Sequence, residues 1–211
     1  MHISLLGDSI FDNSSYTQGG PDVVAQLRPL LGSSDKATLL AVDGATSDDV
    51  HFQLERLPLD ATHLVLSAGG NDALGASDVL LRPVSTVGEG VWMVAEAAQS
   101  FEKRYSRLLD ALESKGLPLI VCTVYNPRFS DPMQQGVCVA ALCLFNDAII
   151  RGALGRGLPI LDLRAICTAH DDYANDIEPS SQGALKIARA IQTILQQHDF
   201  SEKRATIYAS S

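Results

Sequence analysis

The chain has 211 residues, of which 46% are apolar and 19% charged, a balance typical of one globular domain rather than a disordered chain. Its 16 basic and 25 acidic side chains give a net charge of −9. Binding to nucleic acid or to an anionic membrane depends on clustered Lys and Arg, so this charge argues against both kinds of partner. The four cysteines form no CxxC pair and have no histidine at ligand spacing, so we expect neither a disulfide framework nor a metal site.

Five short, nearly continuous apolar runs are typical of strands buried on both faces of a parallel sheet. They are residues 3–6, 37–42, 63–68, 117–124 and 158–163. Helical patterns separate them. The patterns cover residues 21–31, 47–57, 89–116 and 131–154, and a final helix begins at about Ser180.

The alternation of strand and helix predicts a doubly wound α/β sheet with helices on both faces. No repeat or linker interrupts it, so we expect residues 1–211 to form a single domain, with about 200–211 as a tail on its surface. The first residues do not have the basic start and apolar core of a signal peptide, and no apolar run approaches the roughly 20 residues of a membrane span. We therefore expect a cytoplasmic location; the sequence does not predict an oligomeric state.

Ligands bind at the carboxyl ends of the strands in such a sheet. The first three predicted strands are followed directly by Gly7-Asp8-Ser9, by a turn containing Gly44, and by the Gly-Gly-Asn-Asp stretch 69–72. A fourth motif, 175–183, precedes the last helix. Each motif is weak evidence alone, but together they would gather at one edge of the sheet.

These motifs resemble those of the SGNH hydrolases, also called the GDSL esterases and lipases. Residues 7–10 match the first block with Ile10 in place of leucine, Gly44 matches the second, and 69–72 match the third. The resemblance implies a three-layer α/β/α sandwich around a flavodoxin-like, five-stranded parallel sheet. It also implies that Ser9 is the nucleophile, with an oxyanion hole made by the N–H groups of Ser9 and Gly44 and by the Asn71 amide. Rigid donors of this kind stabilise the charge that develops during acyl transfer.

The last block departs from the family pattern, which has an aspartate and, three residues later, a histidine before proline. Pro179 and Gly183 fix the register, so Asn175 and Glu178 stand at those two positions. In one interpretation Glu178 is the general base, its pKa raised by burial towards the working pH. An aspartate beside it would repel it, whereas the Asn175 amide could orient it.

Two other interpretations remain open. His170 lies in the same loop and could supply an imidazole, although a solvent-facing position suits it equally well. Alternatively, the chain is a catalytically impaired relative that binds an acyl or carboxylate ligand in the cleft. Retention of Ser9, Gly44 and Asn71 favours an enzyme, so we expect a serine esterase or acylhydrolase that cleaves a small or medium acyl ester without metal or cofactor.

A polar segment after Ser9, residues 11–23, is long enough to form a lip over the cleft. Asp12, Asn13 and Tyr16 of this segment could contact substrate; alternatively, the segment is a capped loop that leads into the first helix. Asp8 is expected beside the substrate as well, and Asp8 and Asp72 are expected to anchor their loops rather than to act as catalytic acids.

Overall fold

The structure is a computed structural model that describes residues 1–209. Its strands all pair in parallel, in the order β2-β1-β3-β4-β5-β6. Their bounds are β1 His2–Gly7, β2 Lys36–Leu39, β3 His63–Ser67, β4 Leu119–Cys122, β5 Ile160–Leu161 and β6 Ile207–Tyr208. Up to β5 this is the flavodoxin-like order 2-1-3-4-5. The predicted α/β class is confirmed, with six strands rather than five.

The additional strand, β6, comes from the segment expected to be a surface tail. The N–H of Ile160 donates to Thr206 O at 2.8 Å, and the N–H of Asp162 donates to Tyr208 O at 2.9 Å. A strand of two residues with a half-exposed Ile207 carries too little apolar pattern to be recognised from sequence. Residues 210–211 of the expected tail lie outside the described residues.

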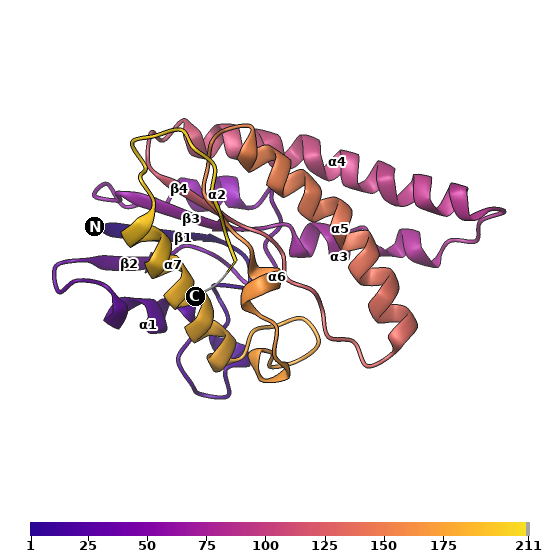
Figure 1. Cartoon of the computed structure of the whole chain (residues 1–211), viewed down its shortest axis with the longest axis horizontal. Helices are drawn as coiled ribbons and strands as arrows, with labels where there is room; N and C mark the ends of the chain where they lie inside the picture. The colour runs from indigo at the N-terminus through magenta and orange to yellow at the C-terminus, as the bar shows by residue number, and fades with distance from the viewer. Residues whose placement is uncertain (210–211) are drawn as a thin grey trace.

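Helices cover both faces of the sheet, as Figure 1 shows. On one face lie α1 (Val23–Leu27), α6 (Leu163–Ile166) and α7 (Ser181–Gln197), and on the other lie α2 (Val50–Leu54), α4 (Val87–Glu113) and α5 (Pro132–Leu154). The short helix α3 (Gly70–Gly75) follows β3 closely. Four short 3-10 helices are η1 (Ser14–Tyr16), η2 (Arg28–Leu30), η3 (Ser77–Leu81) and η4 (His170–Asp172).

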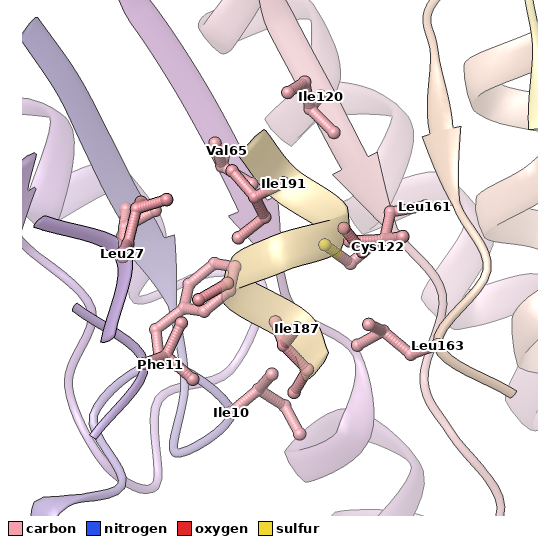
Figure 2. Close-up of a cluster of buried hydrophobic side chains, with 14 of the residues drawn as sticks. Ile10, Phe11, Leu27, Val65, Ile120, Cys122, Leu161, Leu163, Ile187 and Ile191 are labelled. Atoms are coloured by element: carbon pink, nitrogen blue, oxygen red, sulfur yellow. The ribbon is translucent and has the colours of Figure 1, made fainter. Parts of the chain in front are cut away.

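Each face of the sheet has its own apolar cluster. On the α7 side, Ile187 and Ile191 pack with Phe11, Val65 and Cys122 (Figure 2). These side chains are almost completely buried, so their burial is a large favourable term for folding. The two clusters hold the strands rigidly, and with them the loops at the strand ends where the candidate site lies.

Helix α5 differs from the expectation that no segment approaches a membrane span. Of the described helices it is the one long and apolar enough, by length and composition alone, to cross a membrane. Here it packs beside α4, and Phe145 and Ile149 belong to the apolar cluster on that face. The buried Asn146 amide also bonds both the N–H and the carbonyl of Val124, each at 2.8 Å. These contacts tie α5 to the chain just beyond β4.

Candidate active site

The turn after β1 places Ser9 at the carboxyl edge of the sheet. Gly7 has a φ of +129°, and a Cβ there would lie 1.7 Å from the carbonyl oxygen of Ser67, so only glycine fits. The N–H of Asp8 donates to that same oxygen at 3.1 Å, and the carbonyl of Asp8 accepts from Phe11 at 3.1 Å. β1 lies between β2 and β3, so Ser9 stands where the strand order reverses, the usual ligand position in this fold.

Glu178 faces Ser9 across the site. The Ser9 hydroxyl donates to Glu178 Oε1 at 3.1 Å, and the two residues are only 8% and 7% exposed. Asn175 Oδ1 accepts from the N–H groups of Ile177 and Glu178, both at 2.9 Å. Asn175 therefore positions Glu178 through the backbone of the loop, whereas the sequence suggested that its amide would orient the carboxylate directly.

The electrostatics of Glu178 suit a base. Burial raises its pKa from 4.5 to about 7, and the hydrogen bond from Ser9 offsets part of that rise. Its second oxygen, Oε2, is buried and has no hydrogen-bond partner among residues 1–209. A carboxylate whose pKa lies near 7 accepts a proton about as readily as an imidazole does.

Asp8 and Asp72 anchor the loops, as expected. Asp8 Oδ1 accepts from the N–H of Ile10 at 3.2 Å, and burial, assisted by the charge of Glu178, raises the pKa of Asp8 to about 8. Asp8 is therefore mainly protonated at neutral pH, and it also lines the cavity that contains Ser9. Asp72 accepts from both the N–H and the hydroxyl of Ser47 at 2.8 Å, which fixes the segment after Gly44.

The predicted oxyanion donors Ser9, Gly44 and Asn71 follow three different strands, β1, β2 and β3. Asn71 lines the cavity together with Ser9, and its Nδ2 donates one hydrogen to Ala45 O at 3.0 Å, so the other amide hydrogen is free for a ligand. Within residues 1–209 no hydrogen bond uses the N–H of Ser9 or of Gly44. Gly44, with a φ of +80°, is exposed beside the cavity rather than part of its wall.

Asn13 and Asp12, which were predicted to contact substrate, both make hydrogen bonds within the protein. Asn13 is completely buried; its Nδ2 donates to Pro179 O at 3.2 Å and its Oδ1 accepts from Val23 N at 3.1 Å. Asp12 Oδ2 accepts from the N–H of Asp43 at 2.9 Å, and Asp12 does not line the cavity. The polar segment after Ser9 thus braces the loops of Glu178 and Gly44.

The histidine interpretation has no support in this geometry. The side chain of His170 is 97% exposed, and its Nδ1 lies 3.5 Å from Asp171 Oδ1. None of the chain's five histidines, all within the described residues, lines the cavity of Ser9. The carboxylate of Glu178 therefore occupies the place opposite the serine.

Sequence reasoning missed the helical walls of the cavity. Val94 and Ala97 of α4 line it, as does one face of α5 formed by Cys138, Ala141, Leu142 and Phe145. The α5 residues follow the i, i+3, i+4, i+7 spacing of a single helix face, so the face was visible in the sequence. Nothing in the sequence said that this face borders the reacting groups, because that depends on how far the helices extend past the sheet.

The sequence profile of the GDSL-like lipase/acylhydrolase family matches residues 5–185. The chain therefore belongs to this family of enzymes that hydrolyse ester bonds. No curated protein matches the chain.

Several solved structures are similar in fold. An extracellular lipase from Streptomyces rimosus is 17% identical with a TM-score of 0.65, over 94% of this chain and 100% of the lipase. An acetyl xylan esterase is 15% identical with a TM-score of 0.65, over 92% and 100%. Phospholipase A1 from Streptomyces albidoflavus NA297 is 18% identical with a TM-score of 0.64, over 90% and 98%. At these identities the similarity concerns the fold.

Proposed function

We propose that this protein is a serine esterase or acylhydrolase in which Ser9 forms an acyl-enzyme and Glu178 is the general base. The observation that carries the proposal is the buried hydrogen bond, 3.1 Å long, from the Ser9 hydroxyl to Glu178 Oε1. Nucleophile and base within hydrogen-bond reach are the geometric requirement of such catalysis. A protein that only binds an acyl or carboxylate ligand gains nothing from a buried carboxylate aimed at a serine.

The reaction follows from these positions. Ser9 Oγ attacks the ester carbonyl carbon while its proton passes to Glu178, and the N–H of Ser9 and the Asn71 amide stabilise the oxyanion. Gly44, on the adjoining loop, supplies the third donor. The bond to the alcohol then breaks, and the proton on Glu178 moves to the departing alkoxide. Water next attacks the acyl-enzyme, loses a proton to Glu178, and the acid leaves as Ser9 regains its proton.

The pairing of Asn175 with Glu178 is chemically consistent. A histidine base becomes a cation and needs an anion beside it, whereas a glutamate base becomes neutral when it accepts the proton. An aspartate at 175 would place a second negative charge beside the carboxylate. The Asn175 side chain instead accepts two backbone N–H bonds at 2.9 Å and brings no charge.

Fluorophosphonate labelling followed by intact-protein mass spectrometry tests the proposal. We expect one label, on Ser9, at a rate that rises as the pH passes about 7. Glu178→Gln should slow labelling by about 10²–10⁴-fold, because the amide cannot accept the serine proton. Ser9→Ala should not label. His170→Ala changes an exposed residue in the loop of Glu178 and should label like the wild type.

Two results would contradict the proposal. Labelling of Glu178→Gln at the wild-type rate across the whole pH range would exclude Glu178 as the base. A folded wild-type protein that never labels at any pH would exclude the serine hydrolase and favour the ligand-binding alternative.

A further inference from the structure

The cavity that contains Ser9 extends well beyond the reacting groups. Its empty space, with the open solvent at its mouth included, is about 930 Å³. Ser9, Asn71 and Glu178 enter it at the carboxyl edge of the sheet. Its remaining walls come largely from α3, η3, α4 and α5, whose adjoining parts lie together beyond that edge in Figure 1.

Those remaining walls are almost entirely apolar. Leu74, Val79 and Leu80 line the cavity from the α3–η3 segment, opposite the α4 and α5 residues already named. Ala97 and Ala141 are the small members of the two long helices, and their size leaves space that larger side chains would fill. An empty apolar space of this kind forfeits dispersion contacts, which a bound hydrocarbon would restore.

The cavity has too few polar side chains in its walls to bind a charged or sugar-like group. Apart from the reacting groups and Asp8, the polar lining side chains are Ser77 and Tyr125, and the Tyr125 hydroxyl is already bonded to Ile177 O. Of the lining residues, all within 1–209, none is Lys or Arg. A phosphate or a sugar would lose its hydration here without enough partners, whereas an alkyl chain loses nothing of that kind.

We propose that this cavity is an acyl-chain subsite that takes a medium-length fatty acyl group, so that the protein prefers octanoyl-sized esters to acetyl esters. The inference rests on the proposed function and deepens it, because family membership leaves the acyl length open. The carbonyl carbon lies at Ser9 Oγ, and the alkyl chain runs between the α3–η3 segment, α4 and α5. The alcohol part of the ester remains at the open mouth.

A series of p-nitrophenyl acetate, butyrate and octanoate tests the preference. Each methylene transferred from water into the cavity raises kcat/KM by up to about fourfold, so we expect at least a tenfold rise from acetate to octanoate. A flat or falling series would overturn the subsite.

Variants on α5 locate the subsite. Ala141→Trp fills the cavity, so the octanoate-to-acetate ratio of kcat/KM should fall at least tenfold. Ala140→Trp makes the same change one residue earlier, on the exposed face of α5, and should keep the wild-type ratio. Equal ratios in the two variants would overturn the proposal. If Ala141→Trp does not fold, Ala97→Phe fills the cavity from α4 and carries the same expectation.

Calorimetric titration of Ser9→Ala separates the subsite from the chemistry. Octanamide is neutral, so Glu178 does not repel it, and we expect it to bind at least tenfold more tightly than acetamide unless Ala141→Trp is also present. Octanamide binding by a wild-type protein that cleaves no ester would retain the subsite and remove the proposed function. Ester hydrolysis with no acyl-length preference and no octanamide binding would retain the proposed function and remove the subsite.

Discussion

The two carboxylate oxygens of Glu178 have different surroundings. One carboxylate oxygen accepts from Ser9 and the other is buried without a partner among the described residues. Poor solvation of the ionised form is what raises the pKa to about 7. The same poor solvation makes the ionised form a stronger proton acceptor, so the residue that departs from the family pattern is suited to the work of the histidine it replaces.

A pH–rate profile follows from this pKa. The base works only when ionised, so kcat/KM for an ester should rise with pH and level off above about 7. Stopped assays with a neutral ester between pH 5 and 9 measure it. Glu178→Gln should be slow, and its kcat/KM should not show this rise with pH. His170→Ala should keep the rise. If the rise of kcat/KM with pH were unchanged in Glu178→Gln, the titrating group would be a residue other than Glu178.

Asn175 gives a second prediction, because it holds the backbone of the loop and not the carboxylate. Asn175→Ala removes both 2.9 Å bonds, so kcat/KM should fall about tenfold. The rise of kcat/KM with pH should still be centred near pH 7. Asn175→Asp keeps an acceptor for the two N–H groups but adds a negative charge, which should move the rise of kcat/KM to higher pH. A shift of the pH dependence in Asn175→Ala would instead mean that the side chain acts on the carboxylate directly.

At the scale of elements, the junction of β1 with its turn is the most constrained point of the site. Gly7→Ala would place a methyl group 1.7 Å from Ser67 O at a φ of +129°, so the strand end would have to move. We expect unfolding free energy to fall by about 3 kcal/mol or more, measured by urea denaturation.

A matched change elsewhere shows that the loss belongs to the turn. Gly136 lies inside α5, where an added Cβ meets nothing within 4 Å. Gly136→Ala should therefore stabilise the protein by up to about 1 kcal/mol, since alanine is the better helix former. Similar losses in both variants would mean that the Gly7 turn is not specially constrained.

The elements that the sequence predicted well are those with a strong local signal. The apolar runs that became β1 to β5 and the motif glycines mark strands and turns whatever surrounds them. Roles that depend on tertiary contacts were harder to predict. Asn13 looked like a loop residue available to substrate, yet its bonds to Pro179 and Val23 bury it, and these partners are 166 and 10 residues away in the chain. The two-residue β6 depends on pairing with β5 alone.

At the scale of the whole molecule, two of the buried carboxyl groups have raised pKa values in a chain whose net charge is already −9. Burial raises the pKa of Asp8 from 3.8 to about 8 and that of Glu178 from 4.5 to about 7. In the unfolded chain both groups ionise near pH 4, whereas in the folded protein they keep their protons up to pH 7 or 8. Over this interval the folded state binds more protons than the unfolded state, so stability decreases as the pH rises.

The free energy of unfolding should therefore fall between about pH 4 and pH 8. Above pH 8 both carboxyl groups are ionised in either state, so they should cause little further change. In the double variant Asp8→Asn, Glu178→Gln the decline should be flatter, and the gain over the wild type at pH 8 should be on the order of 2 kcal/mol. Urea denaturation at pH 4, 6 and 8 measures both quantities.

General self-repulsion of a negative chain would also weaken the fold as the pH rises, so the comparison needs a charge-matched control. Glu55→Gln with Glu96→Gln removes two negative charges from exposed positions on α4 and just after α2. We expect this control to keep the wild-type slope. If it flattened the curve as much as the double variant does, net charge would explain the pH dependence, and the burial of Asp8 and Glu178 would not. A steep slope that remains only where these two carboxyls remain would instead show that the protein gives up stability to keep an unsolvated base beside Ser9.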